Sequence, residues 1–177
     1  MFGGHGSGVS GERLEDLFRA HAKDVLAYTL RRADRATAEE ITAEVFVVAW
    51  RHIERVPDEA PVLWLYGVAR RLLSNERRAT RRREALIRAL QPLTREAQTD
   101  ARSEPEMMAE ALAALSPRDR ELLMLTAWEG LDATQVSVVL GCKPGAVHTR
   151  LHRARSRLAA QLAKSRTEVL QAEVVTR

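Results

Sequence analysis

The chain has 177 residues, of which 45% are hydrophobic and 29% are charged, and its formal net charge is +4. These values are ordinary for a soluble globular protein and fit one medium domain or two small ones. The single cysteine, Cys142, excludes a disulfide within the chain and favours the reducing cytoplasm. No apolar run approaches the roughly 20 residues that a membrane-spanning helix needs, so we expect no membrane insertion.

The first part of the chain carries helical signals only. Residues 1–11 lack an apolar segment, and we expect them to form a disordered tail rather than a secretory signal. From about residue 12 to residue 32, apolar residues recur at three and four positions, which predicts a first helix. His21 lies on its apolar face, where a packed, hydrogen-bonded histidine is a better interpretation than a catalytic one.

Two more helices follow, separated by a short break. "TAEEITAEVFVVAWRHI" predicts a helix that starts with a capping box of Thr37 and Glu40. A loop is predicted at 55–62, because two prolines bracket it. "LWLYGVARRLLSNERRATRRR" then predicts a helix with an apolar start and a strongly basic end, and residues 84–108 have the weak pattern of a linker.

The second part predicts three helices in close succession. "SPRDRELLMLTAWEG" starts at the capping residue Ser116 and ends at Gly130. "LDATQVSVVLG" starts with Asp132 and Gln135 and ends at Gly141. A turn of three residues, "GCK", then leads into "KPGAVHTRLHRARSRL", which is the order of a helix-turn-helix motif.

The last of these helices has the composition of a DNA-recognition helix. One stripe is apolar (Val147, Leu151, Ala154 and Leu158), and residues 141–166 include seven Lys or Arg but no Asp or Glu. Five residues fit positions that read base edges, and three fit phosphate contacts. The first set is His148, Thr149, Arg150, His152 and Arg153, and the second is Lys143, Arg155 and Arg157.

Two other interpretations of this helix remain. In the first, the helix is a basic surface that is simply exposed to solvent. In the second, Cys142, His148 and His152 bind zinc, although no fourth ligand is evident. The chain shows no catalytic triad, phosphate-binding glycine loop or convincing carboxylate pair. We therefore expect no enzymatic activity and no cofactor.

The third helix combines aromatic and cationic residues, which suits single-stranded or distorted DNA because exposed bases can stack there. The candidate contacts are Trp64, Tyr66, Arg70, Arg71, Asn75, Arg77 and Arg78. The alternative is that the two aromatic residues belong to the core.

The segments "LFRAHAKDVLAY", "TAEEITAEVFVVAW", "WLYGVARRLLSNERRATRRR", "ALAALSPRDRELLML" and "GLDATQVSVVLGCKPGAVHTRLHRARSRL" occur in this order. Together they resemble the extracytoplasmic-function (ECF) sigma factors of bacterial RNA polymerase, over about residues 12–160. The resemblance implies an all-α protein with two small helical domains, a sigma-2 domain at 12–83 and a sigma-4 domain at 109–163. The linker at 84–108 joins them, and residues 164–177 form a tail.

The resemblance also implies partners. Glu40 and Glu44 stand where the family docks on the clamp helices of the beta-prime subunit, and sigma-4 engages the beta-subunit flap. The loop at 55–62 and the helix after it are expected to bind the melted −10 element, with one base captured in a pocket. The final helix is expected to read the −35 element. Anti-sigma factors are further partners in this family, and the sequence identifies none.

Three residues depart from the family pattern. Ala43 stands where a glutamine is usual in the docking helix, and Arg71 replaces an asparagine that often holds −10 DNA. Lys143 replaces the usual serine cap of the recognition helix, which removes a cap but adds a cation near phosphate.

We therefore predict a sigma factor that binds core polymerase and initiates transcription at specific promoters. The first alternative is a stand-alone helix-turn-helix regulator, which would have no need of "TAEEITAEVFVVAW" or "WLYGVARR". The second is a helical adaptor that binds no DNA, which salt-dependent binding to duplex DNA would exclude.

Overall fold

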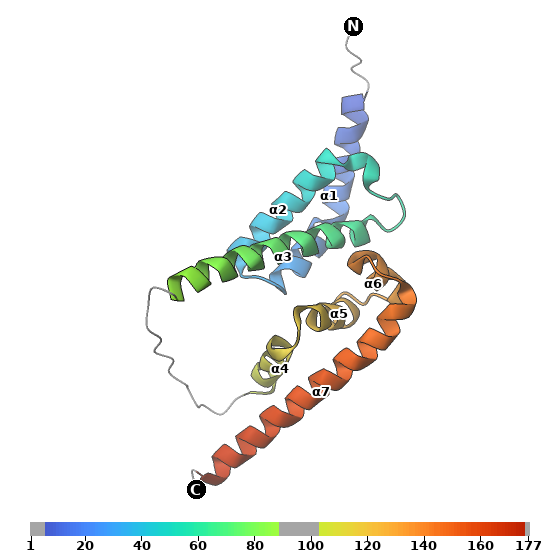
Figure 1. Cartoon of the computed structure of the whole chain (residues 1–177). Coiled ribbons are helices and arrows are strands. Elements are labelled where there is room, and N and C mark those ends of the chain that lie inside the picture. The colour runs from blue at the N-terminus through green and yellow to red at the C-terminus, as the bar shows by residue number, and fades with distance from the viewer. Residues whose placement is uncertain (1–5, 89–102, 176–177) are drawn as a thin grey trace. The chain divides into compact units, whose positions relative to one another are not determined.

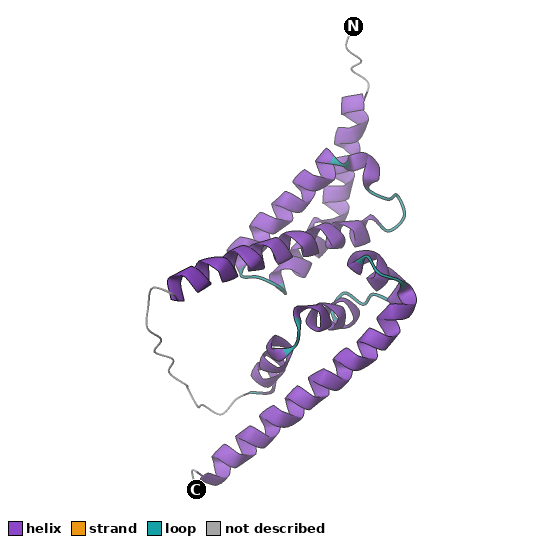
Figure 2. Ribbon diagram, viewed as in Figure 1, coloured by secondary structure: helices purple, strands orange, loops and turns teal. Residues whose placement is uncertain are grey.

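The computed structural model describes residues 6–88 and 103–175, with side chains at 10–83 and 103–167. Within these residues it has seven α-helices and one short 3-10 helix but no strand (Figures 1 and 2), which confirms the all-helical prediction. None of the described helices combines the length and the apolar character needed to span a lipid bilayer. The chain divides into two compact units. The first contains α1, α2, η1 and α3, and the body of the second is α4, α5 and α7.

The first unit is a three-helix bundle with a single 3-10 turn. Its elements are α1 (Gly6–Leu30), α2 (Arg35–Arg51), η1 (Ile53–Arg55) and α3 (Pro61–Arg88). The predicted tail at 1–11 is thus wrong for residues 6–11, which are helical, and residues 1–5 lie outside the described part. The helix α3 also runs five residues past the predicted domain end at 83.

The core of this unit joins all three helices. Val25 and Val45 are fully buried, and burial of one such side chain contributes about 1.5–3 kcal/mol. The ring of Tyr28 stacks on that of Tyr66, with centroids 4.7 Å apart. The guanidinium carbon of Arg32 lies 3.5 Å from the centroid of the Tyr28 ring. These contacts tie the end of α1 to the start of α3.

The start of α2 differs from the predicted capping box. The cap is Asp34, whose Oδ1 accepts from the backbone N–H of Thr37 at 3.0 Å and whose Oδ2 accepts from the Thr37 hydroxyl at 2.8 Å. Because this N–H and this hydroxyl are already bonded to Asp34, Thr37 lies inside the helix and does not cap it with Glu40. The same two bonds, the backbone one first, lower the pKa of Asp34 below its ordinary value.

The second part of the chain contains α4 (Glu104–Ala114), α5 (Pro117–Ala127), α6 (Ala133–Leu140) and α7 (Pro144–Val175), and residues 138–141 at the end of α6 group with the first unit. The helix α4 starts inside the predicted linker 84–108, of which residues 89–102 lie outside the described part. The helix α7 continues to Val175, so the predicted tail at 164–177 is helical for most of its length.

The predicted helix ends in the second part of the chain are confirmed. The hydroxyl of Ser116 accepts from the backbone N–H of Asp119 at 3.1 Å. Asp132 and Gln135 form a reciprocal capping box, with bonds of 3.0 and 2.8 Å. Gly130 and Gly141 have φ of +65° and +64°, the left-handed conformation in which glycine ends a helix.

Candidate nucleic-acid interface

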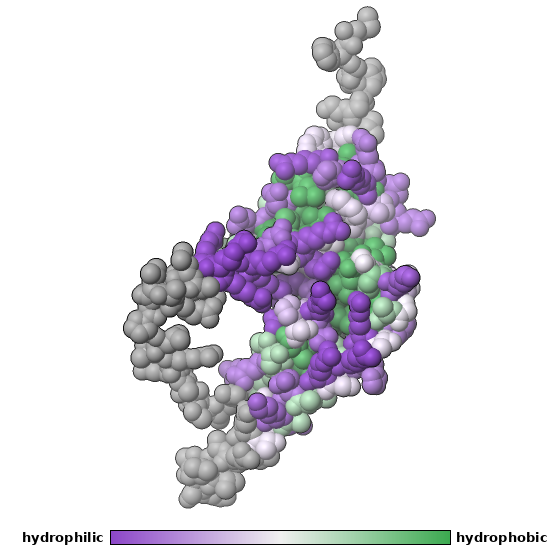
Figure 3. All heavy atoms as spheres, viewed as in Figure 1, coloured by the Kyte–Doolittle hydropathy of each residue, from purple (hydrophilic) through white to green (hydrophobic). Residues whose placement is uncertain are grey.

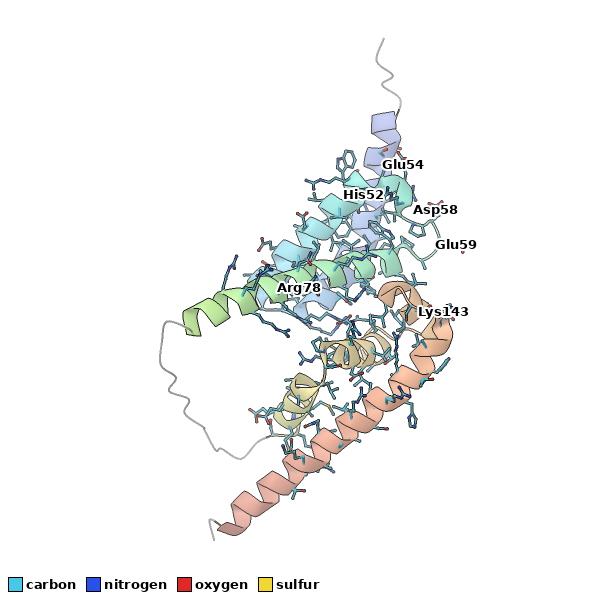
Figure 4. All side chains as sticks on the ribbon, viewed as in Figure 1. His52, Glu54, Asp58, Glu59, Arg78 and Lys143 are labelled. Atoms are coloured by element: carbon cyan, nitrogen blue, oxygen red, sulfur yellow. The ribbon has the colours of Figure 1, made fainter. Side chains whose placement is uncertain are left out.

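The first half of α7 presents a continuous polar face. On its apolar stripe Val147 and Ala154 are buried, and Leu151 and Leu158 are half-buried. The predicted base-reading residues are exposed, and so are the three predicted phosphate contacts: these are His148, Thr149, Arg150, His152, Arg153, Lys143, Arg155 and Arg157. The predicted turn Gly141–Lys143 separates α6 from α7. Lys143 lies just before the first turn of α7 (Figure 4).

Arg157 differs from the others because it is ion-paired within the unit. Its Nη1 lies 2.7 Å from Oδ2 of Asp119, a carboxylate that is only 13% exposed. The hydroxyl of Ser116 donates to the same oxygen at 2.9 Å. The guanidinium of Arg157 is thus directed at α5 and helps to hold α7 there, and its contact with phosphate stays a prediction.

The described residues also bear on the zinc alternative. Cys142 is half-buried in the turn, whereas His148 and His152 are exposed on α7. Within 6–88 and 103–175, no three His, Cys, Asp or Glu residues lie close enough to hold a metal ion.

The aromatic residues of α3 do not share one environment. Tyr66 is 7% exposed and its ring is stacked on Tyr28, so the prediction that it contacts DNA is wrong. Its position in the sequence could not exclude this, because the aromatic partner lies on α1. Trp64 and Arg70 are half-buried.

The basic end of α3 forms a strongly hydrophilic surface (Figure 3). Arg71, Asn75 and Arg78 are exposed, and Nη2 of Arg78 donates to Oδ1 of Asn75 at 2.7 Å. Arg77 is half-buried, and its Nη2 donates to the carbonyl of Arg32 at 3.0 Å. Part of the predicted cationic set therefore holds the bundle together, and the rest remains on the surface.

The predicted loop is shorter than 55–62, because η1 ends at Arg55 and α3 begins at Pro61. Val56 is buried and residues 57–60 are exposed. Glu54, Asp58 and Glu59 place three carboxylates at this end of the bundle (Figure 4).

Arg13 of α1 reaches this loop, which the sequence did not indicate. Its Nη2 donates to the carbonyl of Val56 at 2.6 Å and to Oδ1 of Asp58 at 2.7 Å. The residues it joins are 43 and 45 positions away in the chain, so no local pattern reveals the contact.

A hollow of about 450 Å³ lies beside the 3-10 turn, between the start of α1 and the end of α2. It is lined by residues 51–55, Ser10 and Trp50. Trp50 is 45% exposed, and the lining combines the cationic Arg51 and Arg55 with the carboxylate of Glu54.

The outer face of α2 carries both acidic and large apolar side chains. Glu40 is exposed and Glu44 is half-buried, and Ala43 is exposed between them. Val47 and Trp50 continue this face, and both are more exposed than large apolar residues of a core. Large apolar residues grouped on an exposed helix face are typical of a protein-docking surface.

Comparisons with known families agree with both units. Residues 17–83 match the family described as Sigma-70 region 2, and residues 106–158 match Sigma-70, region 4. The first range covers the bundle of α1, α2 and α3, and the second covers α4, α5, α6 and the basic half of α7.

Individual proteins give the same result. The ECF RNA polymerase sigma factor SigL of Mycobacterium tuberculosis is 34% identical over 77% of this chain and 81% of its own length. RNA polymerase sigma factor YlaC of Bacillus subtilis is 26% identical over 89% and 96%. Among solved structures, the sigma factor RpoE of Bartonella quintana, in complex with the anti-sigma factor NepR, shares the fold with a TM-score of 0.63. It is 21% identical and covers 84% of this chain and 96% of its own. The chain belongs to the ECF sigma factor family.

Proposed function

We propose that this chain binds core RNA polymerase in the cytoplasm, directs it to promoters with a −10 and a −35 element, and helps to open the duplex. It acts as a binding protein rather than an enzyme. The observation that carries the proposal is the pair of separate cationic helices, α3 and α7, each in its own compact unit of the matching sigma-70 family.

For the second unit we propose that α7 reads the −35 element in the major groove. His148, Thr149 and Arg150 lie near its start and are exposed. An arginine there can make paired hydrogen bonds to guanine, and the other cations can contact phosphates. Binding should weaken steeply with salt, because each neutralised phosphate releases a counterion.

For the first unit we propose that the loop 56–60 and the exposed side of α3 hold the separated −10 strand. Arg71, Asn75 and Arg78 are exposed there, and Trp64 is half-buried next to the loop's end at Pro61. Arg70 and Arg77 complete the positive charge on this helix. Contacts that form only with unpaired bases offset the cost of unstacking them.

For the outer face of α2 we propose docking on the clamp helices of the beta-prime subunit, with the beta flap engaging the second unit. Glu40 and Glu44 would pair with cations of the clamp, while Val47 and Trp50 would bury apolar area. An anti-sigma factor that covered this face would compete with polymerase.

The proposal is tested by transcription in vitro with purified core polymerase over a promoter library. A sigma factor directs RNA synthesis from a discrete set of start sites. A stand-alone regulator would bind duplex DNA without directing the core enzyme. If no start site depends on the chain, the proposed function is wrong.

Docking is tested separately by Glu44→Lys. We expect this reversal to weaken binding to core polymerase by about tenfold or more, because it brings a cation to a surface that pairs with cations. The measurement is core retention by the immobilised chain, with Glu15→Lys on α1 as the matched reversal. Glu15 pairs only with Arg19 among its described contacts. Wild-type retention by Glu44→Lys would contradict the assignment.

A further inference from the structure

We propose that Arg13 is a positioning residue for the loop 56–60, and that it sets how sharply the chain distinguishes bases in the −10 element. The inference rests on the proposed role of this loop in holding the separated strand. It concerns a residue of α1 that lies before both matched family regions.

The geometry of Arg13 fits this role. One nitrogen, Nη2, bonds both the carbonyl of Val56 and Oδ1 of Asp58, at 2.6 and 2.7 Å. Val56 is 2% exposed, whereas the Asp58 side chain is 93% exposed. Arg13 thus connects α1 to the buried start of the loop and to its outer part at once. A cationic donor makes these bonds stronger than those of a neutral donor.

The loop has few other restraints from the core. Ile53 and Val56 anchor one end and Leu63 the other, but residues 57–60 between them are all exposed. Ala60 has φ of +51°, which is unfavourable for a residue with a Cβ and persists only when its surroundings fix it. A restraint at Asp58, two residues earlier, helps to hold that conformation.

Position matters because base selection depends on small displacements. Groups that read a base must be held within about 0.5 Å of the productive geometry to discriminate well. A loop that samples several conformations can adapt to the wrong base, and the difference in affinity between bases then falls. Arg13 also places a positive charge next to Asp58, which reduces the repulsion between the loop and the phosphates of the strand.

The test compares Arg13→Ala with Arg19→Ala, using the full chain and core polymerase. Arg19 is a matched control because it is an exposed, ion-paired arginine on the same helix, bonded to Glu15 and Asp16 and not to the loop. Open-complex formation is measured on one promoter and on its variants with single substitutions in the −10 element.

We expect Arg13→Ala to reduce the preference for the best −10 base by about five- to tenfold, an effect of the size that loss of one ordinary hydrogen bond gives. Arg19→Ala should keep the preference. Arg13→Lys should restore part of it, because an ammonium group can donate to one of the two acceptors. Asp58→Ala should add little in the Arg13→Ala background, because both changes break the same contact. Binding to a −35 duplex should be unchanged. An unchanged −10 preference in Arg13→Ala would overturn the inference.

Glu59→Lys separates this inference from the proposed function of the loop. Glu59 is exposed in the same loop, so a lysine there must alter −10 binding if the loop lies against DNA. If Glu59→Lys changes −10 binding and Arg13→Ala does not, only the positioning role is wrong. If Glu59→Lys and Trp64→Ala both behave as wild type, the loop is not at the DNA, and both proposals are wrong.

Discussion

The two cationic helices have similar compositions but use their residues differently. In α3, Tyr66 stacks in the core, and Arg77 donates a hydrogen bond to the carbonyl of Arg32 just after α1. Some aromatic and cationic side chains of this helix therefore pack inside the unit, and others are exposed. In the basic half of α7, a narrow apolar stripe does the packing, and the cations from Lys143 to Arg155 are exposed. Residue type and spacing therefore predict which cationic side chains are exposed on α7, but not on α3.

The largest effect that this difference predicts is at Tyr66. We expect Tyr66→Ala to destabilise the first unit by about 3–5 kcal/mol, because it removes a buried ring together with its stacking partner's contact. Tyr66→Phe keeps the stacked ring and should lose much less stability than Tyr66→Ala. Denaturant unfolding of the full chain measures both variants. A Tyr66→Ala protein that is fully stable but defective only in −10 binding would mean that the ring faces DNA after all.

On α7 the expected effect is on binding. Arg150 is exposed, so Arg150→Ala should leave stability unchanged. We expect its affinity for a −35 duplex to fall by about tenfold to a hundredfold, the loss typical of one paired base contact. Transcription from a −35-dependent promoter should fall with it, while polymerase binding is retained. Fluorescence anisotropy with the duplex gives the affinity, and wild-type affinity would remove Arg150 from the recognition set.

Arg157 should behave in the opposite way. Since its guanidinium is paired with Asp119, Arg157→Ala should lower the stability of the second unit, by about 1 kcal/mol or less because the arginine of the pair is largely exposed to water. The dependence of −35 binding on salt should keep its slope, because no phosphate contact is lost. A shallower salt dependence, as expected for a variant such as Arg155→Ala, would show that Arg157 does contact phosphate.

The features that the sequence predicted correctly are those set by neighbours in the chain. The Ser116 cap, the Asp132 and Gln135 box and the glycine that ends α6 all act within three or four residues, so a local pattern is sufficient. The exposed face of α7 follows from one helical period.

The features that were missed depend on partners far away in the chain. Arg157 is bonded to a carboxylate 38 positions earlier, and Arg13 to a loop 43 to 45 positions later. Tyr66 is buried by a residue of another helix. A periodic pattern gives the face of a helix but not the partner that it meets, so these side chains could not be assigned.

The start of α2 is a different case, because two rival caps lie within one turn. Asp34 and Thr37 are both good capping residues, and the carboxylate wins because it accepts from the N–H of Thr37 and from its hydroxyl. The choice between them is local, but it depends on backbone conformation: Asp34 has an extended backbone, with ψ of 165°.

The smallest predicted effect is the pH dependence of this cap. The bond from the Thr37 N–H, and then that from its hydroxyl, lower the pKa of Asp34 in the folded protein below the ordinary 3.8. The stabilisation is therefore fully present above that ordinary value and is lost as the pH falls through the folded pKa. We expect Asp34→Ala to be less stable than wild type by a constant amount from about pH 5 to 8, and this gap should close below about pH 4. Asp34→Asn keeps an acceptor but does not titrate, so its stability relative to Asp34→Ala should persist in acid. Thermal unfolding at several pH values measures both gaps, and an Asp34→Ala gap that widens in acid would contradict the role of the ionised carboxylate.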